Sequence, residues 1–343
     1  MNTHLNLRRE TRVATTEAPK TTATATATNA AALAVATATP LAQTQRDDRH
    51  PHHSQGGKRQ GRKGGQGNAR IPVAVIICFV VLGMIVLAAI FAPLIAPHDP
   101  TLQSLRDKNK PPVWLGGTTK HLLGTDNLGY DIFSRLLFGS RVSLGIGFFA
   151  ALIGTIIGTT LGLIAGFFRG AADWVIMLLV DAQLATPFIV IAIAAIAAFG
   201  KGIPIIVILA GLSGWMLFAR AVRASVLSMR EREFVVAARA VGAGNGRILW
   251  RHILPNLGSI ILVIATIDLR RVILFEATLS FLGLGVQAPQ ASWGSMIDRG
   301  REYLNTAWWI SVFPGIALVL TVLTVSLIGD WLRDVFDPTL RNG

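Results

Sequence analysis

The sequence predicts an all-α integral membrane protein with six transmembrane helices. Of its 343 residues, 52% are hydrophobic and only 15% are charged, whereas soluble globular proteins carry about 25% charged residues. Several stretches contain no charge over the roughly 20 residues that a helix needs to cross a bilayer. These observations exclude an ordinary soluble protein. The net charge of +13 does not by itself indicate nucleic-acid binding, because the basic residues lie between apolar spans.

The first span is predicted at 71–96. Five more follow, at about 141–168, 174–200, 202–220, 257–282 and 307–329. The fifth of the six is the one whose charge content conflicts with a lipid-facing helix, since it contains Asp268, Arg270, Arg271 and Glu276. Each charge at a helix centre costs about 2.5–3.5 kcal/mol, so these side chains must avoid lipid.

The distribution of basic residues places both termini in the cytoplasm. Residues 1–70 carry eleven Lys and Arg, and the loop 221–256 is also rich in arginine. Cytoplasmic loops carry such an excess in membrane proteins. The segment 97–139 is then periplasmic or extracellular, although it too holds basic residues, and 331–343 is a cytoplasmic C-terminus.

Residues 1–70 are expected to be disordered, because an Ala/Thr-rich run is followed by a basic run and neither can form a core. His50, His52 and His53 in this tail are compatible with metal binding. The alternative is a solvated tail close to anionic lipid headgroups.

A helix is predicted from Met229 to Val241 in the loop 221–256, with Phe234, Ala237, Ala238 and Val241 on one face. Gly242 suits its C-cap, and Pro255 is expected to bend the entry to the fifth span. The small-residue face could dock into a groove on another protein or simply lie on lipid headgroups.

This loop resembles the EAA loop of bacterial ABC-importer permeases, in which E-A-A, three residues, G, nine residues and I-x-L-P follow one another. Ala237, Ala238, Gly242, Leu254 and Pro255 match the pattern. The Glu and Ile positions are occupied by Val236 and His252, and the nearby Glu233 is a candidate for the acidic contact.

Other segments resemble oligopeptide and dipeptide permeases of the C-subunit type. They lie at 121–137, 276–285, 292–294 and 329–338, so the resemblance covers about 72–340. It implies one N-terminal helix followed by a five-helix ABC type I permease core at 140–330, in the bacterial inner membrane. It also implies a second similar permease, two cytoplasmic ATPases that bind ATP and Mg²⁺ and dock at the EAA loops, and an external substrate-binding protein.

The resemblance favours import of di- or oligopeptides, while nickel, opine, aminosugar and glycoside importers share the same motifs. A membrane-embedded enzyme or receptor is the alternative from a different class. The sequence has no phosphate-binding G-x-x-x-x-G-K-[ST], no Ser/His/Asp arrangement and a single cysteine, Cys78. We therefore expect no catalytic residue, no metal site, no cofactor in this chain and no nucleic-acid partner.

Two groups of residues inside the spans have both structural and functional interpretations. The first comprises glycines at four-residue spacing, which favour close helix packing but could also allow a gating slide: Gly154, Gly158, Gly162 and Gly166. The second comprises charged residues that could line a substrate pathway or form structural pairs: Asp181, Asp268, Arg270, Arg271 and Glu276. Asp268 and Arg271, three residues apart, are expected to pair, which leaves Arg270 without a partner on its own helix. Trp293, Trp308 and Trp309 are either interfacial aromatics or part of a docking surface for the binding protein.

Overall fold

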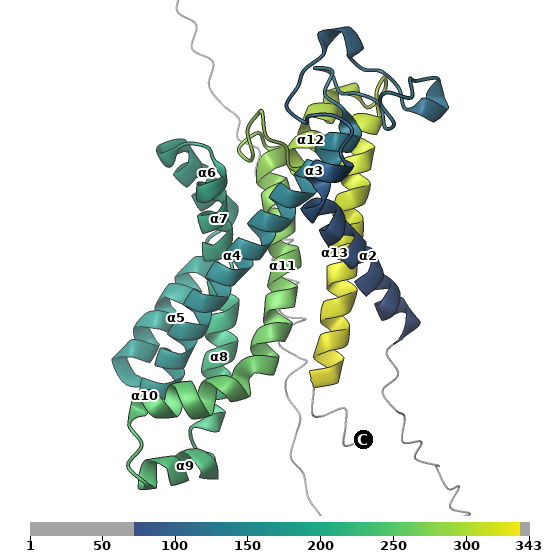
Figure 1. The fold of residues 1–343 in the computed structure, drawn as a ribbon. Helices are drawn as coiled ribbons and strands as arrows, with labels where there is room; N and C mark the ends of the chain where they lie inside the picture. The colour runs from purple at the N-terminus through teal and green to yellow at the C-terminus, as the bar shows by residue number, and fades with distance from the viewer. Residues whose placement is uncertain (1–71, 337–343) are drawn as a thin grey trace, which may run out of the picture. The chain divides into compact units, whose positions relative to one another are not determined.

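The computed structural model describes residues 72–336, and this range is helical with no β-strand (Figure 1). Its only strand-like pairing is an isolated antiparallel bridge between Thr125 and Asp131. The tail 1–70, with its predicted disorder and its histidines, lies outside the described residues, as does the end of the C-terminal segment. The prediction of an all-α chain is confirmed for the part that the structure describes.

The long apolar segments form helices with these bounds: α2 Val73–Ile90, α3 Ala92–Ile95, α4 Ile132–Phe168, α5 Gly170–Ala185, α6 Phe188–Phe199, α7 Ile203–Leu212, α8 Trp215–Met229, α11 Gly258–Phe281 and α13 Trp309–Phe336. By length and apolarity, α2, α4, the α7–α8 segment and α13 can each cross a membrane, and the pair α5 and α6 can supply a fifth crossing. The helix α11 is 24 residues long and contains the four charged residues noted above.

The segment 174–200 differs from the single span that the sequence predicts, because α5 and α6 meet at an angle of 90°. The bend falls at Thr186 and Pro187, which lie in the extended region of backbone conformation. Proline has no N–H to continue the helical hydrogen bonds, and it disfavours the helical conformation of the residue before it. The proline therefore ends α5 and starts a new helix in another direction.

The helix α4 is the centre of the arrangement, since α8, α7 and α11 all pack along it (Figure 1). It begins earlier than the sequence predicts because the Asp131 carboxylate accepts a hydrogen bond of 2.8 Å from the Ser134 N–H and so caps its first turn. On the far side of α11 lies α13, and α2 packs on α13.

The glycine stripe of α4 faces the backbone of α8. A Cβ atom at Gly158 would lie 2.2 Å from the carbonyl oxygen of Trp215, and one at Gly162 would lie 2.6 Å from that of Ala219. At Gly166 the atoms closest to such a Cβ belong to Val226 and Arg223. These contacts support the predicted role of the glycines in close helix packing. The helices that they bring together belong to the same chain.

On the side opposite the loop 221–256, residues 97–131 and 286–308 fold over the ends of α4 and α13, and we call them the outer cap (Figure 1). Its helix α12, Trp293–Gly300, begins with a capping box formed by Ser292 and Ser295. Trp293 and Trp309 are buried in the cap and donate to the carbonyls of Leu136 and Thr125, both at 3.2 Å. They are core residues, so neither explanation offered from the sequence holds for these two.

Asp107 anchors the loop of the outer cap. Its carboxylate accepts hydrogen bonds from Lys110 and, at 2.7 Å, from Ser104 Oγ, while Lys120 Nζ lies 3.6 Å away. These hydrogen bonds, from Lys110 first and then Ser104, hold the pKa of Asp107 far below its ordinary value.

We predict that Gly158→Ala destabilises the chain by about 2–3 kcal/mol, because a methyl group at this position overlaps a backbone carbonyl that cannot move aside easily. The midpoint of thermal unfolding of the purified chain measures the effect. Gly145→Ala is the matched control, since it lies on the same helix and a Cβ there meets nothing within 4 Å. Equal midpoints for the two variants would contradict the packing role of the stripe.

Candidate functional site

The loop 221–256, which we call the inner loop, is built from the end of α8 and four short helices. These are α9 Glu233–Ala240, α10 Asn245–Arg247, the π-helix η3 Ile248–Ile253 and the 3₁₀-helix η4 Leu254–Leu257. The predicted helix from Met229 to Val241 is thus wrong at its start, because α8 continues through Met229 and a turn closed by the Arg232 N–H and the Met229 carbonyl (3.0 Å) precedes α9.

The predicted C-cap at Gly242 is confirmed. Gly242 has φ of +83°, a left-handed conformation that favours glycine. The Ala243 N–H donates to the Ala238 carbonyl and the Gly242 N–H to the Arg239 carbonyl, each at 3.0 Å. This pair of bonds is a Schellman motif, which satisfies the free carbonyls at the end of α9.

The apolar face that the sequence assigns to α9 does not pack as one surface. Val235, which is fully buried, and Ala238 contact the core of the chain. Phe234, Ala237 and Val241 point outward instead, and Val241 is 86% exposed. The two alanines of the matched pattern therefore have different roles, one on each side of α9. The outward residues, together with Val236 at 54% exposure, leave an apolar surface available to another protein.

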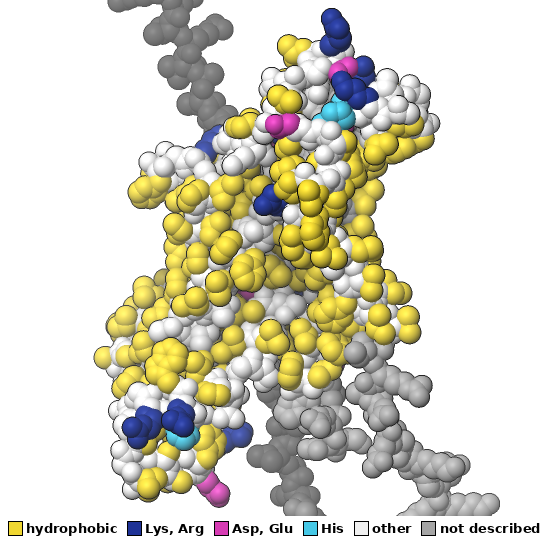
Figure 2. Space-filling model, viewed as in Figure 1, with side chains coloured by type: hydrophobic (Ala, Val, Ile, Leu, Met, Phe, Trp, Pro, Cys, Tyr) yellow, Lys and Arg dark blue, Asp and Glu magenta, His cyan; other side chains and the backbone are white. Residues whose placement is uncertain are grey.

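The remaining residues of the matched pattern lie around this surface. Glu233 is exposed in the first turn of α9, where a carboxylate interacts favourably with the helix dipole. His252 is half-buried in the π-helix, Leu254 packs against the same core as Val235, and Pro255 is exposed in η4. Basic side chains gather at the end of the molecule formed by α9 and α10, next to the hydrophobic surface of the spans (Figure 2).

The inner loop is held firmly to the spans. Its buried residues, Val235, Ile248, Leu249 and Ile253, share one cluster with residues of α4 and α8. Arg230 Nη1 donates to the carbonyl of Phe167 at 3.0 Å, close to the end of α4. Arg223 makes two hydrogen bonds to Asp173, one of them at 2.7 Å, and so joins α8 to α5. The inner loop is thereby packed against α4 and α8.

A second cluster lies in α11, where the expected contact between Asp268 and Arg271 is confirmed. Arg271 Nε and Nη2 lie 2.8 and 2.7 Å from Asp268 Oδ1. Asp268 is completely buried, and Arg271 also donates to Ser213 Oγ at 2.9 Å. A Cβ at Gly214 would lie within 2.8 Å of both charged groups. The glycine thus provides the space for the ion pair, which joins α11 to the α7–α8 junction.

The other charged residues of the spans have separate partners. Arg270 donates to Ser326 Oγ of α13, so the predicted lack of a partner on its own helix is confirmed and its partner is a hydroxyl. Glu276 is fully buried and accepts from Ser280 Oγ at 2.7 Å and Ser143 Oγ at 3.2 Å. The five candidate pathway residues therefore do not form one cluster.

Asp181 pairs with Arg220 of α8 at 2.5 Å, and both side chains are more than half exposed. The nearby Arg169 and Arg223 pair instead with Glu231 and Asp173.

Ser213, Ser143 and Ser280 bond to charged side chains of α11, and the sequence did not predict these contacts. In the sequence each is only a small hydroxyl residue within an apolar helix or at a helix junction. Its contact with a charged side chain is evident only in the folded chain. Ser143 and Ser280 donate to the Glu276 carboxylate, and Ser213 accepts from Arg271, so these hydroxyls reduce the cost of burying the charges.

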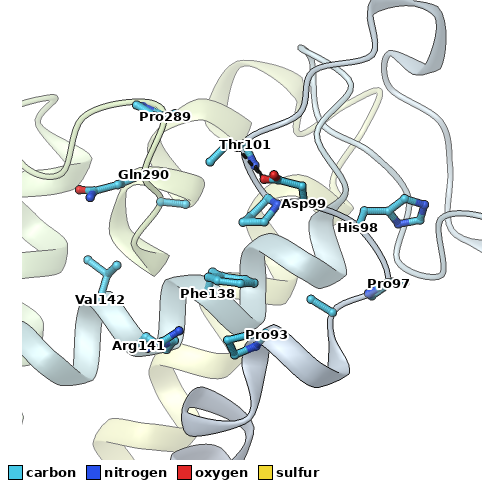
Figure 3. Close-up of a pocket in the computed structure, with 13 residues that line it drawn as sticks. Pro93, Pro97, His98, Asp99, Thr101, Phe138, Arg141, Val142, Pro289 and Gln290 are labelled. Carbon is cyan, nitrogen blue, oxygen red and sulfur yellow. Dashed lines mark hydrogen bonds between the residues drawn. The ribbon is translucent and has the colours of Figure 1, made fainter.

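A pocket of about 700 Å³ opens on the outer side of the chain, between the residues after α3, the start of α4 and the segment 289–291. Figure 3 shows its apolar wall, with Phe138, Val142 and several prolines, and its two charged residues Arg141 and Asp99. Asp99 accepts a hydrogen bond of 2.8 Å from the Thr101 N–H.

Comparison with known proteins supplies two family matches. Residues 158–342 match the model of the inner membrane component of binding-protein-dependent transport systems. Residues 73–112 match the N-terminal transmembrane domain of oligopeptide transport permease C.

Curated relatives match most of the chain. The di/tripeptide transport system permease protein of Pseudomonas aeruginosa is 43% identical over 76% of this chain and 86% of its own. The dipeptide transport system permease protein of Alkalihalophilus pseudofirmus is 42% identical over 78% and 86%. The glutathione transport system permease protein of Pectobacterium atrosepticum is 43% identical over 66% and 75%. Among solved structures, an inward-facing MetNI methionine ABC transporter has a TM-score of 0.50 at 20% identity, covering 60% of this chain and 98% of its own, which is a likeness of fold.

We predict that Gly242→Ala weakens the C-cap of α9 by about 1–2 kcal/mol, because an alanine is strained at positive φ. Gly244→Ala is the matched control, since Gly244 has φ of −68° and both positions have open space for a Cβ. Hydrogen exchange of residues 233–243 in the purified chain measures the local opening. Faster exchange is expected for Gly242→Ala alone, and equal exchange in both variants would refute the strained cap.

We also predict that Arg271→Gln destabilises the chain by about 3 kcal/mol, because it leaves the buried Asp268 without its cation. This is the lower end of the range for buried pairs, since the Arg271 side chain is 32% exposed. The thermal midpoint of the purified chain reports the loss, and adding Asp268→Asn should restore part of it. Arg270→Gln, which loses one hydrogen bond to a hydroxyl, should stay close to the wild type. Equal unfolding temperatures for the two arginine variants would show that Arg271 does not have the structural role assigned to it here.

Proposed function

Because the chain belongs to the family of inner membrane components of binding-protein-dependent transport systems, we propose that it is the permease subunit of an ATP-driven importer of di- or oligopeptides. The observation that carries this proposal is the agreement of the relatives, which are named for transport of dipeptides, tripeptides or glutathione and match most of the chain. Glutathione is itself a peptide, so the three names share one chemical class. This agreement supports peptides over nickel, opines, aminosugars and glycosides.

The importer family brings ATPase and binding-protein components together with its permeases, and we propose that ATP and Mg²⁺ are bound by two ATPase subunits in the cytoplasm. The inner loop of this chain and the corresponding loop of the second permease are the surfaces for their docking. In this chain the exposed apolar residues Phe234, Val236 and Val241 suit a groove on a partner, and Glu233 adds a charge at the rim. The firm attachment of the loop to α4 and α8 would carry the motion of the ATPases to the spans.

The cytoplasmic position of the inner loop and of both termini follows from the distribution of basic residues and belongs to the same proposal. The outer cap then faces the external binding protein. A second, similar permease completes the pathway beside this chain, and the half-exposed charged residues of the spans are the candidates to face it.

Arg270 is the pathway candidate that the contacts favour. Asp268 and Glu276 are fully buried, and Arg271 is held by Asp268 and Ser213, so these three are occupied by structural contacts. Arg270 is half-buried and is held by one hydroxyl on α13. Its guanidinium can attract the carboxylate of a peptide without breaking an ion pair.

We predict that Val241→Asp prevents copurification of the ATPase subunits while the permease still inserts and folds. The 86% exposed side chain contributes little to the core, so the change acts on the docking surface. Leu102→Asp, at 68% exposure on the outer cap, is the matched control and should retain the ATPases. The test uses the full chain coexpressed with its partner subunits. Unchanged copurification with Val241→Asp would show that docking occurs elsewhere.

Uptake in a strain that lacks this gene tests the substrate class. The wild-type chain should restore growth on di- and tripeptides as the only nitrogen source, and failure on every peptide would overturn the peptide assignment. Arg270→Gln should preserve the assembled complex and reduce uptake of acidic peptides most, because the lost positive charge attracts negative substrates. An equal reduction for acidic, neutral and basic peptides would refute the pathway role of Arg270.

A further inference from the structure

Three side chains from separate parts of the sequence lie together in the outer cap. His98 follows α3, His121 lies in the cap loop and Asp131 is the N-cap of α4. His121 Nδ1 lies 2.9 Å from Asp131 Oδ1, and His98 Nδ1 lies 3.8 Å from Asp131 Oδ2. The centroids of the two imidazole rings are 4.8 Å apart. One ligand atom from each residue falls within 4.8 Å of the other two.

Both carboxylate oxygens of Asp131 have hydrogen-bond partners, but one nitrogen of each imidazole ring has none among the described residues. His121 and Asp131 are 4% and 3% exposed. Within residues 72–336, His98 Nδ1 and His121 Nε2 are buried and have no hydrogen-bond partner. Most buried polar atoms in proteins do have one, so two unpartnered ring nitrogens beside a buried carboxylate require an explanation.

We propose that His98, His121 and Asp131 bind a divalent transition-metal ion, and that Zn²⁺ is the ion they suit best. Two imidazole nitrogens and one carboxylate oxygen are a ligand set that zinc accepts. At zinc bond lengths of about 2.0–2.2 Å, two ligand atoms of a tetrahedral ion are about 3.3 Å apart. His121 Nδ1 and Asp131 Oδ1 lie 2.9 Å apart, and one ligand atom of each of the three residues lies within 4.8 Å of the other two, which brackets that spacing.

The neighbourhood leaves room for a fourth ligand. The cluster borders a cavity of about 270 Å³ that is also lined by Gln103 and Ser104, so a water molecule can complete the coordination. Asp107 Oδ2 lies 3.8 Å from His121 Nε2. Its carboxylate is already neutralised by Lys110 and Lys120, so we leave it out of the ligand set.

A metal at this position would fasten the outer cap. His98 is joined by α3 to α2, while Asp131 starts α4, and the His98 N–H already donates to Ser134 Oγ at 3.2 Å. Coordination would add a stronger link between the first helix and the start of the longest helix. This role is structural, because three ligands from three segments hold those segments at fixed distances. It depends on the geometry of the cap and is independent of the transported substrate.

Zinc binding to the purified full chain tests the proposal. The parent protein carries His4→Ala, His50→Ala, His52→Ala and His53→Ala, so that the histidines of the tail cannot contribute. After treatment with a chelator, competition with a zinc indicator should give one zinc per chain, and zinc should raise the thermal midpoint. No zinc binding by the parent would overturn the site.

Two ligand variants make the test specific. His98→Ala keeps the contact between His121 and Asp131, and Asp131→Asn keeps a good N-cap for α4, so both are expected to fold. Each should weaken zinc binding by at least about 10- to 100-fold, the effect of losing even an indirect neighbour of a metal. His252→Ala, in the inner loop, is the matched control and should bind zinc like the parent. Equal affinities for His98→Ala, Asp131→Asn and the control would also overturn the site.

Discussion

The close approach of α4 and α8 is the contact on which the rest of the structure depends. Lipid is as apolar as the side chains, so helices in a membrane gain little from hydrophobic burial and associate through tight packing. Here Gly158, Gly162 and Gly166 of α4 let α8 approach closely over three successive turns. The position of α8 in turn sets the start of the inner loop and the place of Gly214 beside the ion pair of α11.

The same small residues explain how α11 holds its charges. Asp268 fits where Gly214 and Gly154 leave space, and Arg271 is its partner. Arg271 in turn donates to Ser213 Oγ. Glu276 has two serines instead of a cation. A sequence rule that counts charges would reject α11 as a span, whereas its contacts show that two of its four charges are removed from lipid completely. Arg270 differs from the others in having one neutral partner, and this contrast separates a candidate for substrate contact from the structural charges.

One continuous helix, α4, connects the outer cap to the inner loop. With 37 residues, α4 is about 55 Å long. Its first residue follows Asp131 in the outer cap, and its end contacts Arg230 of the inner loop. We expect such a helix to transmit a displacement of the inner loop to the cap without an intervening hinge. The break in the fold lies elsewhere, at Thr186 and Pro187 between α5 and α6.

Features that depend on neighbouring residues could be predicted from the sequence alone. The apolar segments, the four-residue spacing of the glycines, the cap at Gly242 and the pairing of Asp268 with Arg271 follow from hydropathy, helix geometry and the freedom of glycine. The spacing of residues in the inner loop was sufficient to indicate the family. The packing of whole helices was needed to establish that Val235 faces inward while Phe234 and Val241 face outward, that Arg270 meets Ser326, and that His98, His121 and Asp131 come together. A short amphipathic helix offers several nearly equivalent faces, and the partners of a buried charge lie tens of residues away along the chain. Their identity therefore depends on how the helices pack against one another, which local sequence patterns do not specify.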